Sequence, residues 1–248
     1  MIPSFVTSPV KRIARLLARR YVQSILEDEW NRAQCGDLFG EPNERPVEYA
    51  FALAQIARHC PHSVLDIGTG MTAWPHLLAN CGLQVTATDN IRDYWTKTIW
   101  NRHWLVENDN IVNTSMTKTF DMITCMSVLE HIVKYEDAAR SIARLLKPGG
   151  RAIVSVPFNN DLYIDNVYKM EGSRLNHPGV PFVGHVFSRA ALEGAFAKAG
   201  MDLEDEDLFD AHTGDYWSIG KRKSPIVRAS RDSKHDLGCF AFRKAHAP

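Results

Sequence analysis

The stretch Val64–Trp74, VLDIGTGMTAW, brings an acid and two glycines together at the end of an apolar run. In parallel α/β sheets, an apolar strand that breaks into glycines before a helix presents backbone N–H groups to a ligand. The glycines fit G-x-G-x-x-A, the looser form of the dinucleotide fingerprint. Asp66, however, lies two residues before the first glycine. An anion there adds nothing to a pyrophosphate site, whereas it attracts a cationic ligand.

A second acid follows at the end of the next predicted strand. Asp89 lies in VTATDN, 19 residues after Gly70. At that point of a parallel sheet a carboxylate accepts hydrogen bonds from both hydroxyls of a ribose. The ligand is therefore expected to carry an unmodified ribose, a feature that several ligand classes share.

Two further motifs follow in order. FDMITCMSVLEHI (120–132) is an apolar strand that runs into a polar turn, so Ser127, Glu130 and His131 are expected where the fourth strand meets the ligand crevice. LLKPGGRAIVSVP (145–157) is a helix end, a Pro-Gly-Gly turn and a fifth strand. The two glycines supply the positive φ that a sharp return into the sheet requires.

Together these motifs resemble the class I S-adenosylmethionine-dependent methyltransferases, especially the branch with VLEH and LKPGG. The resemblance covers about residues 63–206 and a final strand at 237–243. It implies an α/β fold: a doubly wound, mainly parallel, Rossmann-like sheet of seven strands in the order 3-2-1-4-5-7-6, the last strand antiparallel. Thr72 departs from the pattern, since many members have a small residue there. An oxidoreductase that reads the same glycines for NAD is the alternative.

The resemblance also implies contacts to the cofactor S-adenosylmethionine. Asp66 holds its ammonium end through water, and the backbone of residues 68–70 lies against the methionine portion. Asp89 binds the ribose hydroxyls, while Arg45 and Tyr49 reach the methionine end. Cys125, Met126 and Ser127 lie beside the sulfonium. The other implied contacts along the chain are Gly68, Thr69, Gly70, Asn90, Ile91, Asn110 and Ile111. The alternative for Asp66 is a helix cap, and for Cys125 a simple core position.

Methyl transfer from a sulfonium is an in-line displacement. The protein aligns the reactants, excludes water and removes a proton when the acceptor is a hydroxyl. The candidate bases are His131, His177, His185 and Asp161. Each histidine is alternatively a structural or surface residue. The ten histidines include no cluster with metal-ligand spacing, so no metal is expected.

The elements that position these residues follow from the hydrophobic pattern. Strands are predicted at 63–67, 84–88, 104–106, 120–125, 151–156, 201–209 and 237–243, and helices at 73–80, within 92–101, at 135–146 and at 189–199. Their alternation predicts a mainly parallel sheet. Two long segments, 158–187 and 210–236, fit no regular element and are expected to be insertions on the substrate side, or else decorative loops.

Residues 1–60 are expected to form an N-terminal helical cap, with helices at about 10–30 and 47–59, ahead of a cofactor-binding domain at 61–248. The first 26 residues contain five cations and no acid, and their apolar residues form one helical stripe. Three interpretations stay open: a helix that packs on its own domain, a peripheral membrane contact, and a transit peptide.

Composition narrows the function further. The 248 residues, 45% of them hydrophobic, suit one sizeable α/β domain, and a net charge of zero disfavours nucleic acid as a partner. Five scattered cysteines without C-x-x-C predict a reducing, cytoplasmic location. Motifs of base methylation are absent after the fourth strand. O-methylation of a polar small molecule or glycan is favoured. The alternatives are N-methylation, protein or lipid methylation, and a non-catalytic cofactor-binding subunit.

Overall fold

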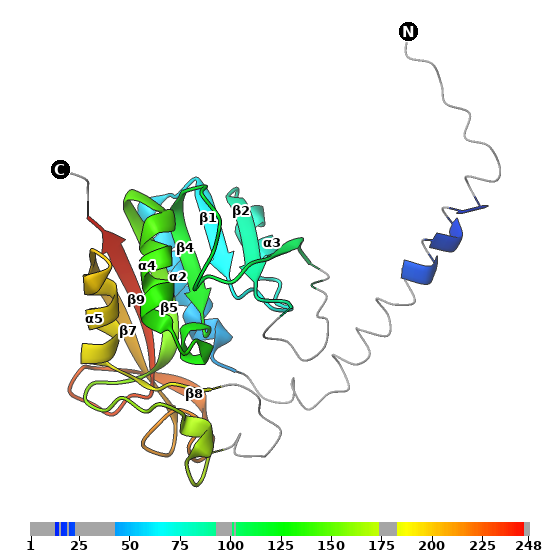
Figure 1. Cartoon of the computed structure of the whole chain (residues 1–248). Helices are drawn as coiled ribbons and strands as arrows, with labels where there is room; N and C mark the ends of the chain where they lie inside the picture. Colours follow the sequence, from blue (N-terminus) through cyan, green and yellow to red (C-terminus); the bar gives the residue numbers. More distant parts are fainter. Residues whose placement is uncertain are drawn as a thin grey trace. The chain divides into compact units, whose positions relative to one another are not determined.

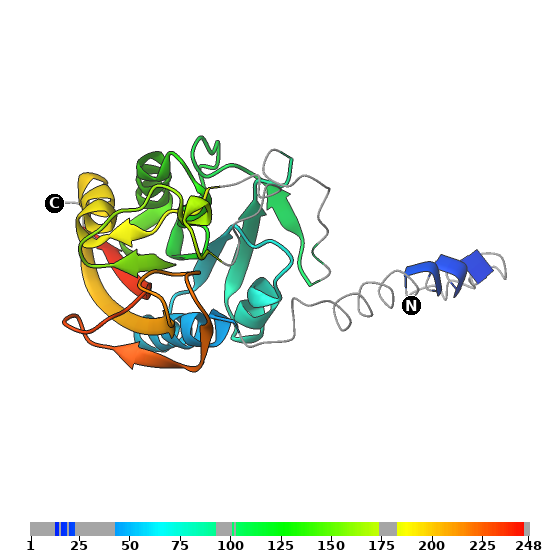
Figure 2. The same ribbon diagram turned by 90° about the horizontal axis from the view of Figure 1, so that it is seen from below.

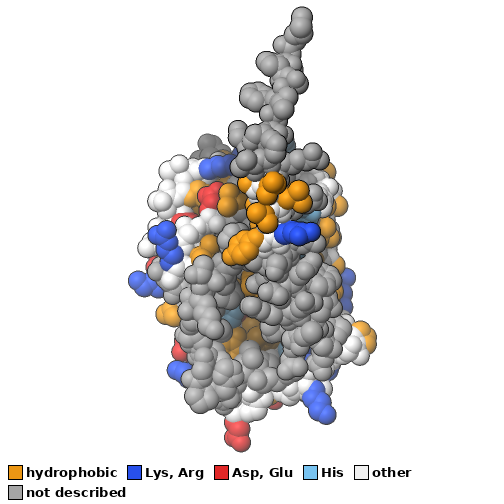
Figure 3. Space-filling view, turned by 90° about the vertical axis from the view of Figure 1, so that its right-hand side faces the viewer, with side chains coloured by type: hydrophobic (Ala, Val, Ile, Leu, Met, Phe, Trp, Pro, Cys, Tyr) orange, Lys and Arg blue, Asp and Glu red, His pale blue; other side chains and the backbone are white. Residues whose placement is uncertain are grey.

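The computed structural model describes residues 13–14, 16–18, 20–22, 43–92, 101, 103–173 and 183–245. The chain divides into two compact units, Met1–Asn43 and Glu44–Pro248. The described residues of the first unit between 13 and 22 are helical and exposed. Among them Leu17 is 63% and Tyr21 71% exposed, and apolar side chains gather beside a cation in Figure 3. No helix among the described residues is long and apolar enough to cross a membrane.

The second unit is built on one sheet of nine strands (Figure 1). The strands are β1 Ser63–Ile67, β2 Gln84–Asp89, β3 Val106–Asn108, β4 Phe120–Met126, β5 Leu146–Asn159, β6 Phe187–Ser188, β7 Met201–His212, β8 Arg222–Ala229 and β9 Leu237–Lys244. Their order is β3-β2-β1-β4-β5-β9-β7-β8, with β6 beside β5. β9 is antiparallel to β5 and β7. The predicted Rossmann-like fold is confirmed, and the seven predicted strands lie in the predicted order. The sheet has nine strands and not seven, because β6 and β8 add to it.

The prediction that residues 210–236 form no regular element is wrong. β7 continues to His212, and β8 pairs antiparallel with it, Leu208 facing Ala229. β8 is an edge strand with the sequence RKSPIVRA, and none of its residues is fully buried. Edge strands carry charges and proline because one side of their backbone needs no ladder partner. Such a strand has the composition of a loop, which is why the hydrophobic pattern did not reveal it.

Helices cover both faces of the sheet (Figure 2). On one face lie α2 Arg45–His59 and α3 Trp74–Asn80, and on the other α4 Tyr135–Leu145 and α5 Arg189–Lys198. Two short 3-10 turns, η2 Leu129–His131 and η3 Val167–Lys169, complete the unit. Because α2 packs in the core of this unit through Phe51, Ala52 and Ile56, the unit begins at Glu44 and not at residue 61. Most of the helix predicted within 92–101 lies outside the described residues.

The two insertions pack on each other. Val167, Tyr168 and Val186 of the first form a small apolar cluster, against which Trp217 and Ile219 of the second pack. A single β-bridge joins Ser173 to Ile219. The insertions therefore form one compact body, which follows β5 and β7 at their carboxyl ends.

Candidate active site

The loop after β1 is held from beneath by Asp66. The carboxylate of Asp66 is buried and accepts hydrogen bonds from the hydroxyls of Thr69 at 2.6 Å and Thr124 at 2.8 Å. Burial raises the pKa of Asp66 to about 6, although both hydroxyls lower it. Gly68 and Gly70 adopt φ of +70° and +56°, values that residues with a side chain rarely adopt. Asp66 thus supports the glycine loop through Thr69, and its contact to the cofactor stays a prediction.

The acid at the end of β2 holds the same loop from the side. Asp89, 7% exposed, accepts a hydrogen bond from the backbone N–H of Gly70 at 2.6 Å. The side-chain amide of Asn101 donates to the carbonyls of Gly70 and Thr72 at 3.0 and 2.9 Å. The glycine loop, β2 and Asn101 are therefore joined at one point. Asn101 was not predicted, because its contacts lie 29 and 31 residues away in sequence.

The end of β4 is bound to α2 by a buried acid. Glu48 is fully buried and accepts hydrogen bonds from the hydroxyls of Ser127 at 2.5 Å and Ser155 at 2.7 Å. Arg45 donates from one nitrogen to Glu48 at 2.8 Å and to the carbonyl of Met126 at 3.0 Å. Ser127 has φ of +53°. These contacts fix the backbone at the predicted sulfonium position.

Glu48 was missed, although the sequence contained a signal for it. The buried residues of α2 are Glu48, Phe51, Ala52, Gln55 and Ile56. They follow the i, i+3, i+4, i+7, i+8 spacing of a helix face that packs on a core. An acid on that stripe requires a buried partner. The pattern identifies the acid, but not Ser127 and Ser155 as its partners.

The other predicted cofactor residues lie around these loops. Tyr49 stacks on Trp74, with ring centroids 4.3 Å apart and an interplanar angle of 12°. Asn110 accepts the N–H of Val112 at 3.0 Å in a local turn. The half-buried Asn90 and Ile91 follow β2 directly, and Ile111, Cys125 and Met126 are buried. Burial raises the pKa of the Cys125 thiol well above its ordinary value, which favours the core role.

The histidines lie on the turn after β4 and in the first insertion. His131 contacts the carbonyl of Val183 through Nδ1 at 2.8 Å. His185 is 1% exposed, its Nδ1 lies 2.9 Å from the hydroxyl of Tyr163, and its backbone N–H donates to the carbonyl of Glu130 at 2.8 Å. The turn and the insertion are thus joined. Asp161 is exposed on the surface, and His177 lies outside the described residues.

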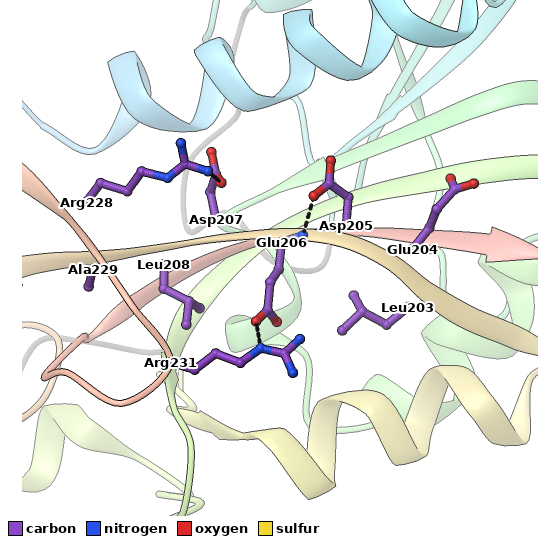
Figure 4. A pocket seen from close by; sticks show the side chains of 9 residues that line it. All are labelled: Leu203, Glu204, Asp205, Glu206, Asp207, Leu208, Arg228, Ala229 and Arg231. Carbon is purple, nitrogen blue, oxygen red and sulfur yellow. Dashed lines mark hydrogen bonds and ion pairs between the residues drawn. The ribbon is translucent and has the colours of Figure 1, made fainter.

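A groove along β7 contains many charges but lies elsewhere (Figure 4). β7 is four strand positions from β1 in the sheet, or about 19 Å at the usual spacing. Each acid of the groove has a basic partner. Glu204 pairs with Arg151, Asp205 with Arg58, Glu206 with Arg189 and Arg231, and Asp207 with Arg228. The groove is thus a network of ion pairs along β7, and it lies apart from the predicted cofactor residues at β1, β2 and β4.

The fold and the glycine loop define a class I S-adenosylmethionine-dependent methyltransferase domain. Residues 18–206 match the family described as "Methyltransferase domain", and the chain belongs to that family. S-adenosylmethionine is the cofactor of this domain.

Two curated relatives are ubiquinone biosynthesis O-methyltransferases. That of Xanthomonas oryzae pv. oryzae is 33% identical over 99 residues, which are 37% of this chain and 41% of the relative. That of Coxiella burnetii is 29% identical over 138 residues, which are 53% of this chain and 57% of the relative. The chain thus spans only about half the length of the curated relatives it matches.

Solved structures share the fold. The 1,6-didemethyltoxoflavin-N1-methyltransferase of Burkholderia thailandensis, solved with its namesake compound and S-adenosylhomocysteine, has a TM-score of 0.56 and 16% identity, covering 98% of this chain and 93% of that one. The N-methyltransferase NodS of Bradyrhizobium japonicum has a TM-score of 0.50 and 14% identity, covering 88% and 97%. At such identities the likeness concerns the fold alone.

The residues present fit the cofactor. A nucleoside with an ammonium group requires hydrogen-bond acceptors and a backbone that it can approach closely. The buried carboxylates of Asp89 and Asp66 supply the acceptors, and the glycine loop with positive φ allows the close approach. We propose that Asp89 binds the ribose and that Asp66, Gly68, Thr69 and Gly70 hold the methionine portion.

Replacement of Asp89 by alanine is expected to weaken S-adenosylhomocysteine binding by about 1.5–3 kcal/mol, because a charge-assisted hydrogen-bond pair to the ribose is lost. Titration calorimetry measures the change. Asp202→Ala, at an exposed position of β7, is the control and leaves the affinity unchanged. Equal affinities of Asp89→Ala and wild type would remove Asp89 from the site.

Proposed function

We propose that the protein transfers a methyl group from S-adenosylmethionine to a hydroxyl of a polar small molecule or glycan, with His131 as the base. The partial similarity to ubiquinone biosynthesis O-methyltransferases supports the transfer to oxygen. The insertions that follow β5 and β7 supply aromatic side chains on the acceptor side, among them Tyr168 and Trp217, whose ring centroids lie 6.2 Å apart.

The hydrogen bond that fixes the ring of His131 is the observation that carries the proposal. A carbonyl oxygen only accepts hydrogen bonds, so Nδ1 of His131 donates to Val183 and carries the proton. Burial lowers the pKa of His131 below its ordinary value of 6.5, so the ring is neutral at pH 7. Nε2 then has a lone pair. A neutral imidazole with a fixed tautomer on the turn after β4 can take a proton from a hydroxyl as the methyl group arrives.

His131→Ala is expected to lower turnover on the order of a hundredfold, because general base catalysis is lost. Affinity for S-adenosylhomocysteine stays unchanged, since the base acts on the acceptor. Turnover is followed with methyl-labelled S-adenosylmethionine and a panel of alcohols, phenols and sugars beside the matching amines. His76→Ala, an exposed position on α3, is the control.

The panel separates the alternative functions. If label is transferred to the amines and not to the hydroxyl compounds, the reaction is N-methylation. If His131→Ala methylates a hydroxyl compound at the normal rate, His131 is not the base and the candidates are His185, His177 and Asp161. Tight binding of S-adenosylmethionine with no labelled product from any small molecule, peptide or lipid indicates a non-catalytic subunit.

A further inference from the structure

Glu130, on the turn after β4, has a buried carboxyl group that the roles described above do not use. Its side chain is 1% exposed, and Oε2 has no hydrogen-bond partner among the described residues. Oε1 lies 3.9 Å from Nε2 of His131. A buried carboxylate with one oxygen left without a hydrogen bond is disfavoured, so this group requires either a proton or a cationic neighbour.

The charges that face Glu130 come from three elements. The N-terminal end of α2 contributes Glu44, Arg45 and Glu48, β4 contributes the neutral thiol of Cys125, and its own turn contributes His131. Burial raises the pKa of Glu130 to about 8. The two acids of α2 raise it as well, while its own backbone N–H and Arg45 act against them. At neutral pH the group is therefore mostly protonated.

Glu130 is connected both to the first insertion and to the end of β4. Its backbone carbonyl accepts a hydrogen bond from His185 of the first insertion. Arg45, which acts on its carboxyl group, donates to the carbonyl of Met126 at the end of β4. Met126 lies between Cys125 and Ser127, and these three residues are predicted to lie beside the sulfonium. A positive charge placed there favours the carboxylate form of Glu130.

We propose that Glu130 releases its proton to solvent on binding of the sulfonium cofactor, and that the resulting carboxylate raises the basicity of His131. Glu130 acts through His131 and is a positioning residue. The proposal rests on the proposed function and deepens it: the base becomes stronger only once the methyl donor is in place. An imidazolium formed by proton transfer from the acceptor is stabilised by the carboxylate 3.9 Å from Nε2.

The test compares two ligands that differ only at sulfur. S-adenosylmethionine is a sulfonium cation there and S-adenosylhomocysteine is neutral. Proton release linked to the ammonium group, the ribose or Asp66 occurs with both ligands and cancels when the two values are subtracted. Calorimetry at pH 7 in phosphate and in Tris gives the number of protons released. We expect roughly 0.5–1 more proton for S-adenosylmethionine, since a group with a pKa near 8 is mostly protonated at pH 7. At pH 9.5 the difference disappears in the wild type.

Variants assign the proton. Glu130→Gln abolishes the difference between the two ligands, and Glu130→Asp retains part of it. Glu136→Gln, at a half-exposed position on α4, leaves the difference intact. Equal proton release by both ligands in the wild type at pH 7, or a difference that survives in Glu130→Gln, overturns the proposal. Failure of both ligands to bind overturns the proposed function itself.

A measurement without ligand checks that Glu130→Gln is folded and that the carboxyl group is buried. The pKa of Glu130 is raised from 4.5 to about 8 in the folded protein. The stability contributed by its protonated form is complete below the unfolded pKa and is lost as pH rises through about 8. Between pH 6 and 9 the melting temperature of the wild type therefore falls more than that of Glu130→Gln. Parallel curves contradict the buried protonated state.

Discussion

Replacement of Glu48 by alanine is expected to destabilise the protein by about 3 kcal/mol or more, because removal of one partner of a buried pair leaves its remaining groups uncompensated. Arg45 loses its carboxylate partner, and the hydroxyls of Ser127 and Ser155 lose their acceptor. Urea denaturation measures the loss. Because Ser127 holds φ of +53°, the turn after β4 is expected to shift and cofactor affinity to fall as well.

Two further variants separate the charge from the hydrogen bonds. Glu48→Gln keeps an oxygen for the hydroxyls and loses only the charge, so its free energy of unfolding is expected to lie between those of the wild type and Glu48→Ala. The double variant Arg45→Met/Glu48→Leu removes both charges and is expected to be more stable than Glu48→Ala, since an apolar pair is often as good as a buried ion pair. A double variant less stable than the single one contradicts this interpretation.

Gly68→Ala is expected to destabilise the protein strongly, because the added methyl group has no room in the glycine loop. A Cβ at Gly68 lies 2.3 Å from Cγ2 and 2.7 Å from Cγ1 of Val128. Overpacking of this kind typically destabilises by about 1–3 kcal/mol, and the φ of +70° adds about 1–2 kcal/mol for a residue with a side chain. Thermal denaturation measures the loss, and S-adenosylhomocysteine affinity falls with it.

Gly82→Ala is the matched control. Gly82 has φ of +86°, and nothing lies within 4 Å of its Cβ position. Its loss of stability therefore measures only the cost of a positive φ for a residue with a side chain, about 1–2 kcal/mol. The double variant Gly68→Ala/Val128→Ala removes the two Cγ atoms and recovers part of the difference. If Gly68→Ala and Gly82→Ala are equally destabilised, Val128 does not restrict the loop.

The main sheet could be predicted because its strands are buried runs. β1 coincides with the predicted 63–67, and all five of its residues are buried. β4 and β9 begin where predicted and extend by one residue. A strand buried on both faces is a nearly continuous run of apolar residues. β3 is shifted to 106–108, since only three half-exposed or exposed residues define it.

Much of the candidate site could not be predicted, because its contacts are long-range. Glu48 meets Ser127 across 79 residues and Ser155 across 107. Local spacing places an acid on a buried helix face, but which hydroxyls it meets depends on how α2 packs on the sheet. The motifs placed Asp66, Asp89 and His131 at the carboxyl ends of β1, β2 and β4, and their cofactor and catalytic roles stay predictions.

The contact between the two insertions restricts how this domain can be re-engineered for other acceptors. Tyr168 and Val186 are buried against Trp217 and Ile219, and Arg222 at the start of β8 pairs with Glu44 before α2. A graft of residues 158–187 from a relative brings a surface that the native second segment does not complement. On the proposal that the two insertions bind the acceptor, we expect specificity to be transferred only when both segments come from the same donor and Glu44 is retained as the partner of Arg222.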